Sequence, residues 1–126
     1  MSQNSYRFST THEWLKPTEH GTYLLGISDH AQQALGDIVF INFPEAGDRF
    51  KAGEVMMDIE SVKAASDLYC PLNAEIIGVN AVLLDEPERL NQSPYETYIV
   101  ELKSDQSLDD LMDEAAYLAY VKDAEA

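Results

Sequence analysis

Residues 55–72, VMMDIESVKAASDLYCPL, carry the clearest structural signal in the sequence. An apolar segment at residues 54–60 is followed by residues 61–66, which are small and mostly polar, and by a second apolar segment at residues 67–72. Two apolar segments joined by a short polar one are typical of a β-hairpin. The sequence therefore predicts a hairpin over residues 54–72 with Lys63 near its tip.

Short apolar segments between turn signals continue on both sides of this hairpin. The chain has 126 residues with five prolines and six glycines, and no linker or low-complexity stretch divides it. This spacing predicts short strands, which we place at residues 6–8, 12–16, 22–28, 37–43, 74–80 and 95–103, with residues 37–43 buried. A chain of this length is expected to form one domain, residues 1–126, mainly β with minor α.

Three helical segments are expected. A short helix at residues 29–35 has Ser28 or Asp29 as its N-cap and ends at Gly36. A short helix and loop at residues 81–91 is broken by Pro87. The clearest helix lies at about residues 107–122 and begins at Ser107, a favourable N-cap. Its apolar face at helical spacing carries Leu108, Leu111, Met112, Ala115 and Leu118, and we expect it to cover one side of the β core.

The charge of the chain limits its partners. Eight Lys and Arg stand against 23 Asp and Glu, a formal net charge of -15. Such a field repels phosphates, which makes nucleic acid and anionic membranes poor partners and favours basic protein surfaces. Simple solubility explains the charge equally well. The single cysteine cannot form an intramolecular disulfide, and residues 1–5 lack signal- and transit-peptide features, so a cytoplasmic protein is expected.

Most chemical motifs are absent from the sequence. We find no Gly-rich phosphate loop and no cysteine pair for zinc, and His12, His20 and His30 show no ligand spacing. No metal site is therefore expected. Trp14 is predicted to be a core residue, and Cys70 a plain buried thiol.

Lys63 is the unusual residue. It is one of five lysines, and its neighbours in SVKAAS (residues 61–66) are small. A lysine at a hairpin tip is exposed and available for acylation. The simpler interpretation is that Lys63 keeps a turn soluble, and spacing and composition alone favour that interpretation.

Several motifs occur in one order between about Tyr6 and Tyr120. They are THEW (11–14), GISDHAQ (26–32), LGDIVF (35–40), PEAGD (44–48), ESVKAASD (60–67), LDEPERLN (84–91) and SPY (93–95). Together they resemble the glycine cleavage system H protein, and residues 60–67 resemble its lipoyl-attachment motif. The resemblance implies a lipoyl/biotinyl-domain-like fold, a flattened β-barrel or sandwich (barrel-sandwich hybrid) with short helices and a C-terminal helix.

The resemblance also implies a role as a carrier rather than an enzyme. Lys63 would be amide-linked to lipoate by a lipoylating enzyme. The aminomethyl group of glycine would pass from a pyridoxal-phosphate decarboxylase (P-protein) to a tetrahydrofolate-dependent aminomethyltransferase (T-protein). A dihydrolipoyl dehydrogenase (L-protein) would then reoxidise the arm. A tethered arm reaches several active sites at high effective concentration, and a mobile, strongly negative carrier is expected to be a monomer.

Four further residues take roles from the resemblance. The resemblance implies that Glu60, three residues before the lysine, would help the lipoylating enzyme to recognise the site. Glu13 and Asp67 match family positions that line a cleft protecting the loaded arm from water, and Thr11 lies nearby. A carboxylate facing a cationic amine is favourable electrostatics.

The chain departs from the family pattern at three places. Ala74 stands eleven residues after the lysine, where the family usually has glycine, which suits a tight turn with positive φ. After Pro94 and Tyr95 the chain reads Glu96-Thr97-Tyr98 without the usual Gly or Trp. Ala34 replaces a histidine found in some members. These differences bear on lipoylation and on partner docking.

Other functions remain open at this point. An H-like lipoyl relay, or a lipoyl carrier in sulfur metabolism, would fit the same lysine motif, and failure to load methylamine would favour it. Biotinyl domains usually place methionines on both sides of the lysine, and the neighbours Val62 and Ala64 argue against biotin. Lipoyl domains of 2-oxoacid dehydrogenase acyltransferases usually read D-K-A and are shorter, and Val62 and the length of 126 residues argue against them. An unmodified acidic binding module would keep its function after Lys63→Arg.

Overall fold

The computed structural model describes residues 6–125. Its elements follow the chain in this order: β1 (Arg7–Phe8), β2 (Glu13–Pro17), β3 (Tyr23–Ile27), α1 (Asp29–Leu35), β4 (Ile38–Asn42), β5 (Arg49–Phe50), β6 (Val55–Ser61), β7 (Ala65–Tyr69), β8 (Ala74–Val79), α2 (Val82–Asp85), α3 (Arg89–Gln92), β9 (Val100–Lys103) and α4 (Glu114–Glu125). The expectation of a mainly β protein with few helices is confirmed.

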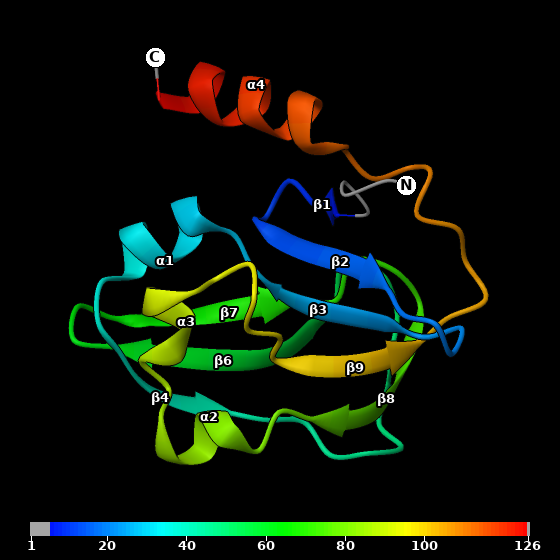
Figure 1. Cartoon of the computed structure of the whole chain (residues 1–126), viewed down its shortest axis with the longest axis horizontal. Helices are drawn as coiled ribbons and strands as arrows, with labels where there is room; N and C mark the ends of the chain where they lie inside the picture. The colour runs from blue at the N-terminus through cyan, green and yellow to red at the C-terminus, as the bar shows by residue number, and fades with distance from the viewer. Residues whose placement is uncertain (1–5, 126) are drawn as a thin grey trace.

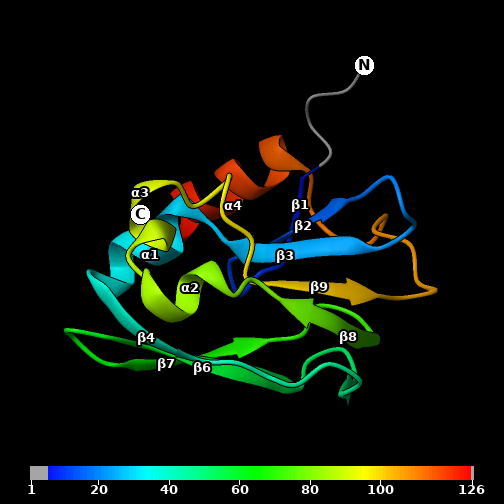
Figure 2. The same ribbon diagram turned by 60° about the horizontal axis from the view of Figure 1, so that its bottom comes forward.

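The strands form two antiparallel sheets that face each other (Figures 1 and 2). The larger sheet has the order β1-β2-β3-β9-β8-β5, and the smaller has the order β4-β6-β7. In the described part of the chain the ladders give two sheets rather than one closed barrel, so the flattened sandwich of the sequence prediction is the form observed. No helix within residues 6–125 is long and apolar enough to cross a membrane.

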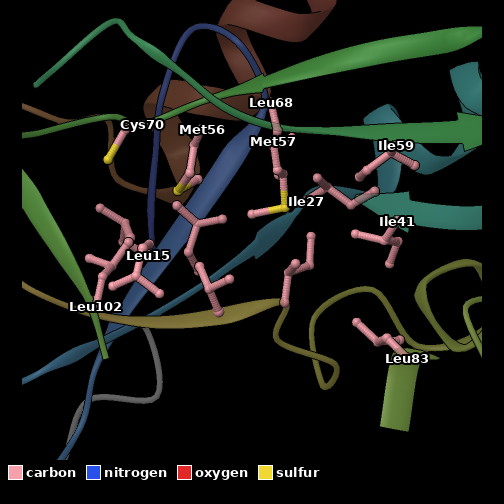
Figure 3. Close-up of a cluster of buried hydrophobic side chains, with 14 of the residues drawn as sticks. Leu15, Ile27, Ile41, Met56, Met57, Ile59, Leu68, Cys70, Leu83 and Leu102 are labelled. Atoms are coloured by element: carbon pink, nitrogen blue, oxygen red, sulfur yellow. The ribbon is translucent and has the colours of Figure 1, made fainter. Parts of the chain in front are cut away.

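The core lies between the two sheets. Figure 3 shows side chains from both sheets converging there, with Leu15 and Ile27 from the larger sheet and Ile59 and Leu68 from the smaller one. Leu83 of α2 closes one end of the layer. Burying each such side chain contributes about 1.5–3 kcal/mol. This core buries the inner face of the smaller sheet.

The predicted hairpin is confirmed as β6 and β7. Its pairing places Ile59 opposite Ser66 and Glu60 opposite Ala65. Because successive side chains point to opposite faces of a strand, Ile59 is buried while Glu60 is exposed. The hairpin therefore presents one apolar face to the core and one polar face to solvent.

Helix α1 also follows its sequence signals. The Ser28 hydroxyl accepts a hydrogen bond from the Ala31 N–H, and Gly36 ends the helix with φ +76°. Helices α2 and α3 flank Pro87, as the break there predicts. These three short helices lie at the same end of the molecule as the β6–β7 turn (Figures 1 and 2).

The C-terminal helix begins later than predicted, at Glu114 instead of about residue 107. Met112 forms an isolated bridge with Phe8, each donating its N–H to the other's carbonyl oxygen. The backbone at Met112 is therefore paired with β1, and the Asp113 side chain caps the helix by accepting from the Ala116 N–H. The predicted apolar face of this helix was therefore wrong. Leu118, which the prediction placed on that face, is exposed, and Tyr117, which it did not include, is buried.

Two predicted strands differ from the structure. Residues 95–103 form a strand only at Val100–Lys103, because the preceding segment turns below Trp14, whose indole N–H donates to the Pro94 carbonyl oxygen. Strand β4 was predicted to be buried, yet its bulge between Ile38 and Phe40 turns two successive side chains outward. Trp14 and Cys70 are both buried, as expected.

Candidate functional site

Lys63 lies in a tight turn closed by Ser61. The Ser61 N–H donates to the Ala64 carbonyl oxygen at 2.9 Å. The Ser61 hydroxyl oxygen also accepts from the N–H groups of Lys63 and Ala64, both at 3.2 Å. These bonds fix the backbone of the turn while the Lys63 side chain remains exposed. The arrangement gives a free amine on a well-defined support.

The segment that follows α1 supports this turn from below. The Val62 N–H donates to the Asp37 carbonyl oxygen at 2.9 Å. The Lys63 stem lies over Gly36, where an added Cβ would be 3.2 Å from Lys63 Cε. Glycine thus permits the close approach of the lysine stem to the helix end.

Asn91 holds that supporting segment in place. Its Nδ2 donates to the Gly36 carbonyl oxygen at 2.8 Å and to Gln32 Oε1 at 2.9 Å. Its Oδ1 accepts from the Ile38 N–H at 2.9 Å. One amide therefore ties α1, the segment under Lys63 and the start of β4 to α3. Sequence reasoning missed this role, because Asn91 stood out only as the last letter of a motif.

Glu60 lies on the outward face of β6, opposite Phe40 of β4. Its carboxylate accepts a long bond of 3.4 Å from Asn42 Nδ2, which also donates to Asp58 Oδ2 at 2.8 Å. Glu60 is therefore available to a partner that approaches Lys63 from the outer face of the smaller sheet.

Glu13 is a buried carboxylate with a complete set of donors. Its side chain is 1% exposed, and the hydroxyls of Ser9 and Thr11 donate to its Oε1. Its Oε2 accepts from the Tyr69 N–H at 3.1 Å, which joins β2 to the free edge of β7. Burial raises the pKa of Glu13, and the three hydrogen bonds oppose that rise.

A cleft of about 670 Å³ opens beside the residues that bind Glu13. Its lining includes the Glu13 partners Ser9, Thr11 and Tyr69, together with Cys70 and Met112. Burial raises the pKa of the Cys70 thiol to about 11, so this thiol stays protonated and inert. The lining thus offers the hydroxyls of Ser9 and Thr11 and the carboxylate of Asp110, with a mostly apolar remainder. Glu13 itself is buried behind these hydroxyls and is not part of the lining.

Asp67 lies apart from Glu13. It faces outward on β7 and pairs with Asp58 across the ladder. Two residues further along β7, the Tyr69 N–H donates to Glu13. The five residues of β7 span about 13 Å at ~3.3 Å per residue. The β7 edge therefore leads from the Lys63 turn past Asp67 to the cleft, while Thr11 and Glu13 meet directly.

Comparison with known proteins identifies the family. A family model described as glycine cleavage H-protein matches residues 6–124. The chain belongs to this family. It is 51% identical to a glycine cleavage system H protein of Chromohalobacter salexigens over 118 residues, covering 91% of this chain and 90% of that protein. It is 46% identical to one of Vibrio atlanticus over 123 residues, covering 95% and 98%.

A solved structure of the H-protein family has the same fold. The crystal structure of a glycine cleavage system H protein from Mycobacterium marinum superposes with a TM-score of 0.82 and 28% sequence identity. The superposition covers 99% of this chain and 100% of that chain. The whole sandwich is therefore shared, with the β6–β7 hairpin as part of it.

The departure from the H-protein pattern at Ala74 leaves the backbone in an ordinary conformation. Ala74 begins β8, pairs with Phe50 and is buried. Among the non-glycine residues described, only His12 has positive φ, so position 74 does not need glycine here. Ala34 is exposed on α1.

No cluster of three or more metal-ligating side chains occurs within residues 6–125.

Proposed function

We propose that Lys63 is the lipoylated residue of a glycine cleavage carrier. The observation that carries this proposal is the exposed amine on a turn fixed by Ser61 and by Val62 bonding to Asp37, in a chain of the H-protein family. The small side chains of Ala64 and Ala65 leave room for an enzyme around the amine. The residues present fit an amide-linked lipoyl group.

Attachment of lipoate changes the charge of the turn. The Lys63 amine attacks the carbonyl carbon of an activated lipoyl group, a C–N amide bond forms, the activating group leaves and the amine loses a proton. The amide is neutral, so the chain becomes more negative than its formal charge of -15. The bonds from Ser61 hold the backbone still while the arm moves.

When attached to Lys63, the lipoyl group would supply a disulfide able to accept the aminomethyl group of glycine from the P-protein, pass it to the T-protein and be reoxidised by the L-protein. The protein itself positions the arm and performs none of these steps, which is why we propose a carrier and not an enzyme. Tethering raises the effective concentration of the arm at each active site.

The cleft lined by Ser9, Thr11 and Tyr69 is proposed to shelter the loaded arm. The hydroxyl oxygens of Ser9 and Thr11 and the carboxylate of Asp110 would face a cationic amine, with the carboxylate of Glu13 buried behind the hydroxyls. A cation in the cleft would favour the ionised form of Glu13 and oppose the effect of burial on its pKa. Asp67 would meet the arm along the β7 edge, before the cleft.

Glu60 is proposed to assist the lipoylating enzyme, because its exposed carboxylate lies on the outward face next to the turn. A monomer in the cytoplasm completes the proposal. The strong negative charge supports a monomer through mutual repulsion. A single buried thiol is consistent with a reducing compartment.

A decarboxylation assay tests the proposed role. The chain, lipoylated at Lys63, is mixed with a purified glycine decarboxylase and labelled glycine, and methylamine loading is followed by mass. Loading is expected for the lipoylated chain and none for Lys63→Arg, which keeps the charge but cannot form the amide. A lipoylated chain that accepts no methylamine would contradict the glycine role and favour the lipoyl relay or sulfur-metabolism carrier.

A further inference from the structure

A bulge in β4 exposes two large apolar side chains beside the Lys63 turn. The register of β4 against β6 shifts between Ile38 and Phe40. Val39 and Phe40 are 52% and 50% exposed, whereas regular alternation would have buried one of them. Bulges of this kind occur next to functional sites, where they redirect side chains.

Val62 extends this apolar surface onto the turn itself. It is 66% exposed and immediately precedes Lys63. Its N–H bond to the Asp37 carbonyl oxygen fixes it next to the start of β4. We call Val39, Phe40 and Val62 the turn patch. Strand β4 is also an edge of its sheet, and an exposed apolar edge strand promotes aggregation unless a partner covers it.

The surroundings of the turn patch are acidic. Lys63 is the only Lys or Arg in residues 52–88, and residues 17–48 contain none. Outward-facing carboxylates of the same sheet include Asp58, Glu60 and Asp67. A partner surface that is complementary to the turn patch therefore has an apolar recess surrounded by Lys or Arg.

We propose that the turn patch is the docking surface for the enzyme that acylates Lys63, with Phe40 seated in an apolar recess of a basic surface. This inference rests on the proposed lipoylation. An enzyme that forms the amide must bring its active site to the Lys63 amine, so it covers the residues next to it. Partners that act on the far end of the arm can work at a distance from the turn.

Kinetics of lipoylation test the proposal. The unmodified full-length chain is incubated with a purified lipoate–protein ligase, lipoate and ATP, and kcat and KM for the chain are measured. Phe40→Ser and Val62→Ser are expected to raise KM about tenfold or more with kcat within about twofold. Added salt is expected to raise the KM of the wild-type chain by screening its carboxylates.

Leu118→Ser is the matched control. Leu118 is an apolar residue of α4 that is 57% exposed, and α4 lies on the opposite side of the molecule from β4 (Figures 1 and 2). The KM of the ligase for the Leu118→Ser chain is expected to stay within about twofold of the wild-type value. Circular dichroism in the near ultraviolet confirms that each variant keeps the environment of buried Trp14.

The outcomes separate the inference from the proposed function. A tenfold rise in KM for both patch variants, with the control unchanged, supports the docking surface. A wild-type chain that is lipoylated while both patch variants keep their KM overturns the inference alone. So does normal lipoylation of a variant that fails only in methylamine loading, which would assign the patch to the decarboxylase. A wild-type chain that receives no lipoyl group overturns the proposed function and the inference with it.

Discussion

The side-chain amide of Asn91 donates to the carbonyl oxygen of Gly36 at 2.8 Å. Gly36 lies directly under the Lys63 stem, so a residue of α3 supports the turn that carries the amine. The same Asn91 side chain accepts from the Ile38 N–H. The position of Lys63 therefore depends on a contact between segments far apart in sequence.

Asn91→Asp should loosen the Lys63 turn. A carboxylate cannot donate, so it would face the oxygens of Gly36 and Gln32 without a hydrogen bond. The expected loss is about 1–3 kcal/mol in the free energy of unfolding. Hydrogen exchange of the Val62 N–H, which bonds to Asp37, should become about tenfold faster.

Asn80→Asp is the control for this experiment. Asn80 Nδ2 donates to the Tyr98 carbonyl oxygen at 2.8 Å, and its Oδ1 accepts from the Val82 N–H. The Asn80→Asp substitution should lower the free energy of unfolding by a similar amount. It should not selectively speed hydrogen exchange of the Val62 N–H. Equal exchange rates at Val62 in both variants would show that Asn91 does not support the turn.

Gly36→Ala should displace the Lys63 stem. The added methyl would lie 3.2 Å from Lys63 Cε, and the backbone at φ +76° and ψ -156° disfavours any side chain by about 1–3 kcal/mol. Gly21→Ala is the control, because Gly21 has φ +80° and nothing lies within 4 Å of an added Cβ. Both variants should lose stability, and only Gly36→Ala should shift the Lys63 side-chain resonances. Unchanged resonances would show that the stem does not rest on Gly36.

The structure explains why sequence reasoning found the hairpin and α1 but missed other features. Ser28 and Gly36 act on their own helix, so local pattern was enough to place its ends. The start of α4 depends on the bridge between Met112 and Phe8, which no local pattern contains. The support from Asn91 and the bulge at Val39 likewise arise from contacts between distant segments. Lys63 stood out because its motif is local.

Burial of Glu13 should give the protein a pH-dependent stability. Its pKa is raised in the folded state from an ordinary value of 4.5. The unfolded chain therefore loses the Glu13 proton at a lower pH than the folded chain. The contribution of Glu13 to the free energy of unfolding thus falls as pH rises from about 4.5 through the folded pKa. Glu13→Gln keeps an acceptor for Ser9 and Thr11 but turns its NH2 toward the Tyr69 N–H, so it loses that bond at every pH. Because Gln does not titrate, the unfolding free energy of the variant should nevertheless rise relative to wild type as the pH rises across that window. Urea unfolding at several pH values measures the difference, and a difference independent of pH would contradict the raised pKa.

Tyr117 should anchor α4 to the rest of the fold. Its hydroxyl lies 2.7 Å from His12 Nδ1 and 2.7 Å from Ser28 Oγ. Burial raises the pKa of Tyr117 to about 12, so the hydroxyl stays protonated. Tyr117→Phe should lose about 1–3 kcal/mol of unfolding free energy.

Tyr120→Phe serves as the comparison for Tyr117→Phe. The Tyr120 hydroxyl is exposed and donates only to the Thr10 carbonyl oxygen at 3.2 Å. Its removal should change the unfolding free energy by less than about 0.5 kcal/mol. Thermal or urea unfolding compares the two variants, and equal losses would argue against the Tyr117 anchor.

Lipoylation of Lys63 can be read from the intact mass and peptide map of the protein purified from its native cells. We expect a mass gain of one lipoyl group, located on the peptide that contains Lys63 and absent from the other four lysines. An unmodified Lys63, in cells whose other lipoyl proteins are modified, would show that the chain is not a lipoyl carrier.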